Sequence, residues 1–138
     1  MADTEIPELD EFLNQWTDSS NQAKKAFLQL LDHLQKKDPV QLEFIPRQGL
    51  TYSLRVSHPN QTARPLFGMV DVIEDDPRWL SVCFFGEMIT DPDEKGDMVP
   101  EGLLGEDAHC FDIYEYEASE VAYVAKRLDE AFEMAAKG

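Results

Sequence analysis

The fold is decided by two apolar runs, LFGMVDVI at residues 66–73 and WLSVCFF at residues 79–85. The segment between them, EDDPR at residues 74–78, has the composition of a turn. Strand-forming residues on both sides of a short turn predict a β-hairpin, which we place at the centre of a sheet. Apolar side chains occur on both alternating faces of each run, so we expect both faces to be covered. The cover is either helices on both sides, or helices on one side and a second subunit on the other.

Further strands are expected on both sides of this hairpin. Residues 40–45 and 50–56 flank a turn at residues 46–49, and residues 110–114 form another apolar run. Apolar and polar residues alternate strictly over residues 50–56, which predicts a strand with one wet face.

Three helices are predicted from apolar residues spaced three and four apart. The first covers residues 6–17, the second follows a cap at Asp18 or Ser19 and ends at Pro39, and the third starts at a Ser119 cap and runs to residue 136. The order of elements predicts an α+β fold, an antiparallel sheet of about five strands packed by two N-terminal helices and one C-terminal helix. We expect one domain over residues 1–138, because no linker or internal repeat divides the chain.

The formal net charge of −16 is the strongest feature of the composition. Such a charge repels nucleic-acid phosphates and anionic membranes, so we expect neither as a partner. The charge favours attraction to a basic protein segment or a cationic ligand, beside its ordinary effect on solubility.

The expected compartment is the cytoplasm, because the acidic residues 1–5 lack the basic and apolar regions of a signal peptide. No apolar run reaches membrane-spanning length. Cys83 and Cys110 both lie in apolar runs. In a reducing compartment such a pair is expected as two buried thiols and not as a disulfide.

The most informative segment for function is residues 87–109, which shows neither helical nor strand periodicity. A loop of this length in a small domain is often a binding loop or a lid. It combines many acidic residues with a few apolar ones, and Lys95 is its only full cation. Alternatively, its apolar residues only attach the loop to the core. The candidate binding residues are Asp91, Asp93, Glu94, Asp97, Met98, Leu103 and Leu104.

Two motifs in this segment are typical of metal or thiol chemistry. Asp91, Asp93 and Gly96 match the first, third and sixth positions of a calcium-binding EF-hand loop, but Lys95 stands where a ligand oxygen belongs. His109 and Cys110 are adjacent, so on a strand they point to opposite faces and cannot easily share one ligand sphere. We therefore expect neither an EF-hand nor a reactive cysteine.

The layout, size and acidity resemble those of small bacterial α+β proteins, including the acidic iron-chaperone-like group similar to frataxin. Frataxin-like chains open with one helix and not two, so no site residue is carried over from this resemblance.

Taken together, these features predict a non-enzymatic binding or interaction module that uses the acidic loop 87–109 to bind a basic protein segment or a cationic ligand. No cofactor and no catalytic residue is assigned, and a homodimer is expected. The alternative is a small enzyme or a metal or iron carrier that uses the carboxylates of the same loop.

Overall fold

The computed structural model describes residues 5–138, so the acidic start at residues 1–4 lies outside the described residues. The elements in chain order are α1 (Pro7–Gln15), α2 (Ala23–Gln35), β1 (Gln41–Arg47), β2 (Thr51–Ser57), β3 (Gly68–Ile73), β4 (Trp79–Phe85), the 3-10 helix η1 (Gly86–Met88), β5 (Asp97–Leu103), β6 (Glu106–Ile113) and α3 (Ala118–Ala136). Among these described helices, none is long and apolar enough to cross a membrane.

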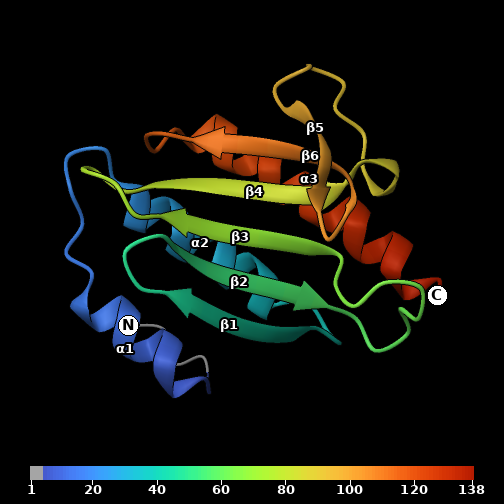
Figure 1. The fold of residues 1–138 in the computed structure, drawn as a ribbon, viewed down its shortest axis with the longest axis horizontal. Helices are drawn as coiled ribbons and strands as arrows, with labels where there is room; N and C mark the ends of the chain where they lie inside the picture. Colours follow the sequence, from blue (N-terminus) through green and yellow to red (C-terminus); the bar gives the residue numbers. More distant parts are fainter. Residues whose placement is uncertain (1–4) are drawn as a thin grey trace.

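The strands form one open antiparallel sheet in the order β1-β2-β3-β4-β6-β5 (Figure 1). The predicted α+β class is confirmed, and the predicted central hairpin is β3 and β4, the two middle strands of the sheet. In their register Val70 lies opposite Val82 and Val72 opposite Leu80, so the apolar residues of the two runs form continuous rows.

The sheet has six strands where about five were expected, and the additional strand is β5. It lies inside the segment predicted to be irregular and forms a hairpin with β6. The hairpin turn is Leu104–Gly105, and both residues have positive φ, 52° and 82°, as a two-residue type I′ turn requires. Pro100 and a register shift between Val99 and Leu103 interrupt the alternation of β5. That interruption is why strand periodicity was not visible in the sequence.

The helices cover one face of the sheet. Figure 1 shows α2 and α3 behind the strands. Helix α1 packs at the β1–β2 end, where Phe12 stacks on Tyr52 with ring centroids 4.5 Å apart. On the covered face Leu54, Val70 and Val82 lie in one row across β2, β3 and β4, and all three are buried. This face holds the core that the apolar stripes of the helices require.

The predicted helices are confirmed, with two corrected caps. The N-cap residue of α2 is Gln22 and not Asp18 or Ser19, although the carboxylate of Asp18 accepts hydrogen bonds from the backbone nitrogens of Lys24 and Lys25 in the first turn, at 3.1 and 3.2 Å. The expected Ser119 cap is wrong. Helix α3 begins at Ala118, preceded by Glu117, so Ser119 already lies inside its first turn.

The second face of the sheet carries no helix among the described elements, so the first of the two alternatives, helices on both sides, is wrong (Figure 1). This open face bears the side chains of β2, β3, β4 and β6 that alternate with the core residues. Most of them are half-buried, because neighbouring side chains cover one another. At the end of β4, Phe85 is buried on this side beneath the guanidinium of Arg64, which lies 4.4 Å from the ring centroid.

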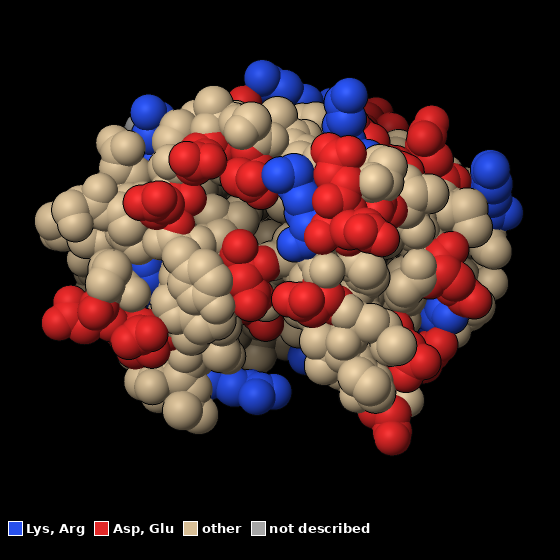
Figure 2. Space-filling view, turned by 90° about the horizontal axis from the view of Figure 1, so that it is seen from above, with Lys and Arg blue, Asp and Glu red and all other residues tan. Residues whose placement is uncertain are grey.

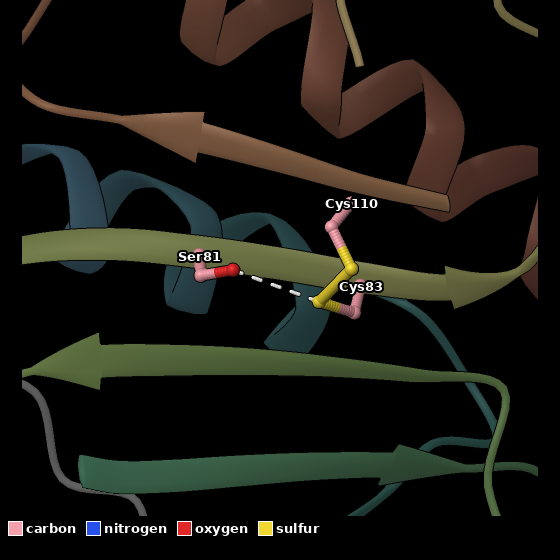
Figure 3. The surroundings of a disulfide bond; sticks show 3 residues. All are labelled: Ser81, Cys83 and Cys110. Carbon is pink, nitrogen blue, oxygen red and sulfur yellow. Dashed lines mark hydrogen bonds between the residues drawn. A yellow bond between two sulfur atoms is a disulfide. The ribbon is translucent and has the colours of Figure 1, made fainter. Parts of the chain in front are cut away.

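The expectation of two reduced, buried thiols is wrong, since Cys83 and Cys110 form a disulfide on the open face (Figure 3). The two residues lie directly opposite each other in the β4–β6 register, with Cα atoms 4.1 Å apart. Both are half-buried and not enclosed in the core. The sequence showed two apolar runs but not that these runs are neighbouring strands.

Candidate functional site

The β5–β6 hairpin, residues 97–113, exposes an unusual share of the apolar surface. Met98 is 63% exposed, Val99 39% and Leu104 51%. The other large apolar side chains exposed among the described residues are Leu50, Tyr114 and Met134, which lie on other elements. Clustered exposed apolar residues are typical of an interaction surface, whereas single ones are ordinary.

Leu103 differs from its neighbours, because its side chain is only 2% exposed. It lies opposite Glu106 at the end of the hairpin and contributes to the core. Of the three predicted apolar binding residues, Met98 and Leu104 therefore face solvent and Leu103 attaches the hairpin to the fold. The alternative that apolar residues attach the segment to the core is therefore confirmed for Leu103, while Met98 and Leu104 remain exposed.

The hairpin is also an edge of the sheet, since β5 pairs only with β6 among the described strands. An edge strand offers unpaired backbone N–H and C=O groups to another extended chain. Pro100 cannot donate a backbone hydrogen bond, and the bulge that follows twists the strand. The regular part of the edge is therefore short and comprises residues 97–99.

Acidic side chains surround this edge, and several have no basic partner. Figure 2, seen from above Figure 1, shows acidic groups outnumbering basic ones on this side of the molecule. Arg64 pairs with Glu87 and Glu106, and Lys95 pairs with Glu120 at 2.8 Å. Among residues 5–138, the following exposed acids of the segment form no ion pair: Asp93, Glu94, Asp97, Glu101 and Asp107.

Asp91 has a different role from the other predicted acids, because its carboxylate points into the protein. Its side chain is 10% exposed. One oxygen accepts hydrogen bonds from Tyr123 Oη and from the backbone nitrogen of Lys95, the latter at 3.0 Å. The other accepts from the backbone nitrogen of Gly96 at 2.9 Å and lies 2.8 Å from Nε2 of His109. Asp91 thus connects residues 89–96 to β6 and α3.

The electrostatics of Asp91 follow from these contacts. Burial by itself raises the pKa of the carboxyl group, but the hydrogen bonds outweigh burial and hold the pKa of Asp91 well below its usual range. On Tyr123, burial and the hydrogen bond to Asp91 both raise the pKa of the phenol. Asp91 is therefore an ionised carboxylate whose acceptor sites are occupied by protein donors.

These contacts bear on the metal-binding alternative. A cation would have to compete for Asp91 with donors that the fold already supplies, and Gly96 contributes its N–H group to that carboxylate. Within the described part of the chain, no group of three or more His, Cys, Asp or Glu residues could hold a metal ion. His109 and Cys110 are separated as expected, with His109 bonded to Asp91 and Cys110 in the disulfide.

A groove of about 460 Å³ lies beside Met98, between Arg64 and His109. Its floor includes Phe85, and its acids are Glu87 and Glu106, which share the single positive charge of Arg64, and Asp107, so the groove keeps a net negative charge. The groove shows that a guanidinium fits between an aromatic ring and two carboxylates at this end of the hairpin.

Three residues of this site were not predicted, namely Arg64, His109 and Tyr123. Arg64 lies in a loop 23 residues before its partner Glu87 in sequence, and Tyr123 lies 32 residues after Asp91. No local pattern connects residues that meet only through the fold. No family model, curated protein or solved structure matches the chain.

Proposed function

We propose that the protein is a non-enzymatic binding module whose β5–β6 hairpin captures a basic, extended segment of a partner protein. One observation carries the proposal. Met98, Val99 and Leu104 are exposed on an edge hairpin whose neighbouring acids lack basic partners. Apolar contact, a free strand edge and unneutralised negative charge occur at the same place.

The acidic residues, the apolar residues and the strand edge contribute to binding in different ways. An exposed ion pair contributes only about 0–1 kcal/mol, so the acids mainly select basic partners and speed association. Buried apolar side chains supply most of the affinity of an interface. Backbone hydrogen bonds to the edge hold the partner in an extended conformation, as in strand addition. Pro100 restricts such pairing to the residues 97–99.

Peptide display tests this proposal with a defined probe. Random peptides are selected on the immobilised protein, and the recovered sequences are synthesised and measured by fluorescence anisotropy. The expected peptides alternate basic and apolar residues, and their affinity falls as salt rises from about 50 to about 500 mM, because salt screens exposed charges.

Two variants that each lose three negative charges and one exposed methionine locate the site. The hairpin variant carries Met98→Ser with Asp93→Asn, Glu94→Gln and Asp97→Asn. The control variant carries Met134→Ser with Glu115→Gln, Glu117→Gln and Glu133→Gln, all exposed residues of other elements. The hairpin variant should lose at least about tenfold in affinity, or ~1.4 kcal/mol, while the control retains it apart from a small loss of long-range attraction. Equal affinity of both variants for the selected peptides would show that the hairpin is not the site.

A further inference from the structure

The open face of the sheet carries a polar row that crosses four strands. Ser53 of β2 lies opposite Asp71 of β3, Asp71 lies opposite Ser81 of β4, and Ser81 lies opposite Asp112 of β6. The order across the sheet is therefore Ser, Asp, Ser, Asp, with a hydroxyl and a carboxylate on each side of the boundary between β3 and β4.

The groups of this row are largely buried, and part of their hydrogen-bonding capacity is unused among the described residues. Ser53 is only 7% exposed. Asp71 Oδ1 and the nearby Arg55 Nε are buried and have no hydrogen-bond partner among the described residues. Burial raises the pKa of Asp71, while a hydrogen bond from the Ser53 hydroxyl and the positive charges of Arg55 and Arg47 oppose that rise. Buried polar atoms are nearly always hydrogen-bonded in folded proteins, so Asp71 Oδ1 and Arg55 Nε require water or groups of a second molecule as partners.

We propose that the open face binds a second copy of this chain, with a two-fold axis that lies parallel to the strands over the boundary between β3 and β4. Such an axis places β2 of one copy over β6 of the other, and β3 over β4. Ser53 then faces Asp112 of the second copy, and Asp71 faces Ser81. Each hydroxyl meets a carboxylate, either directly or through one bridging water.

The rows on both sides of the polar row match in the same arrangement. Ile73 and Trp79 are paired within one chain, as are Met69 and Cys83. In the proposed dimer, Ile73 therefore faces Trp79 of the second copy, and Met69 faces the disulfide at Cys83 of the second copy. All four residues are half-buried within the single chain, so the contact would remove their remaining exposed apolar surface from water. The same surface patch serves both copies, as an isologous two-fold contact requires.

The face has the size of a small interface. The four strands that overlap, β2, β3, β4 and β6, lie about 4.8 Å apart with about seven residues of 3.4 Å each, so they form a face of roughly 460 Å² before its corrugation is counted. A standard interface buries about 800 Å² of accessible surface per partner. The basic residue Arg55 lies in the row of Met69, Cys83 and Cys110, so in the proposed dimer it faces Cys110 of the second copy, one row from Asp112, and a long arginine side chain directed along the strand would pair with that carboxylate.

Sedimentation equilibrium on the wild-type chain tests the proposal first. The expected mass is twice 15.8 kDa at micromolar concentration. Dimerisation should strengthen as salt rises, because salt screens the repulsion between two chains that each carry a charge of −16. A chain that stays monomeric at every concentration and salt level overturns the proposal.

Complementary variants then test the arrangement. R55E places an acid against Asp112 of its second copy, and D112K places a base against Arg55, so each variant alone should be monomeric. In an equimolar mixture the new glutamate faces the new lysine and Asp112 faces Arg55, so a heterodimer should form. Circular dichroism establishes whether each variant is folded. If one is unfolded, the pair S81D and D71S replaces them. S81D alone places two carboxylates opposite each other, whereas its mixture with D71S again places a hydroxyl opposite each carboxylate. A wild-type dimer whose mixed variants remain monomeric contradicts this packing.

The two surfaces are separable in these experiments. The hairpin variant should sediment as the wild type does, and R55E should bind the selected peptides as the wild type does. Loss of the dimer therefore leaves the proposed peptide binding unaffected, and loss of peptide binding leaves the dimer unaffected.

Discussion

Nε2 of His109 lies 2.8 Å from the carboxylate of Asp91, and this contact ties the segment 89–96 to β6. Tyr123 completes the connection from α3. The segment that precedes the proposed binding edge is therefore held in place, which would limit the conformational entropy that the hairpin loses if a partner binds.

Replacing Asp91 with Asn should destabilise the protein at neutral pH by about 1–3 kcal/mol, because a buried, hydrogen-bonded charge is lost. The pKa of Asp91 is lowered by folding, so the unfolded chain takes up the proton first as the pH falls. The stabilisation is therefore complete above the unfolded pKa of about 3.9 and is lost progressively at lower pH.

Urea unfolding of wild type and D91N from about pH 7 down to about pH 2 checks this expectation. The difference in the free energy of unfolding should narrow below about pH 4. Asp93→Asn, an exposed neighbour, is the control and should stay within about 0.5 kcal/mol of wild type. A difference between wild type and D91N that is independent of pH would contradict the ionised, hydrogen-bonded Asp91.

Reduction of the Cys83–Cys110 disulfide should lower the free energy of unfolding by about 2–4 kcal/mol, because the bond closes a loop between residues 27 apart. Urea unfolding with and without reductant measures the change. The double variant C83A/C110A should be insensitive to reductant. Two free thiols in denatured protein that was purified without reductant would show that the bond is not formed. Trapping the thiol state in intact cells also tests the predicted cytoplasmic location, where disulfides are rare.

The elements that could be predicted from sequence are those with a local signal. The stripe of α2 and the strict alternation of β2 come from the chain's own periodicity, and both are present in the structure. Strand β5 was missed because Pro100 and a bulge remove its alternation. The pairing of β4 with β6, and hence the disulfide, depends on which strands become neighbours, and no local pattern specifies that.

The candidate site was predicted as a composition and not as a geometry. The acidic and apolar residues are neighbours in the sequence, but the sequence did not show in which direction each side chain points. Asp91 points inward and Leu103 is buried, while Met98 and Leu104 face solvent. On an irregular segment, the direction of a side chain depends on contacts with residues far away in the sequence. Asp91, for example, contacts Tyr123, and no sequence pattern indicates that these two residues meet.

Substitutions at the neighbouring residues Leu103 and Leu104 distinguish an effect on stability from an effect on peptide affinity. Leu103→Ala removes a buried side chain and should cost about 2–5 kcal/mol of stability. Leu104→Ala removes an exposed one and should change stability by less than about 0.5 kcal/mol, while it weakens binding of the selected peptides. Thermal unfolding and anisotropy titrations on both variants make the comparison. If L104A binds the selected peptides as tightly as the wild type, Leu104 is not part of the peptide-binding surface.

The most direct measurement of the central claim is a titration of the isotope-labelled protein with a selected basic peptide, followed by backbone amide resonances. Binding at the β5–β6 hairpin predicts the largest shifts at residues 97–104, and newly slowed hydrogen exchange at the outer amides of residues 97–99 as the edge becomes paired. Shifts concentrated on the open face of β2, β3 and β4, with residues 97–104 unchanged, would contradict the claim that the hairpin is the binding surface.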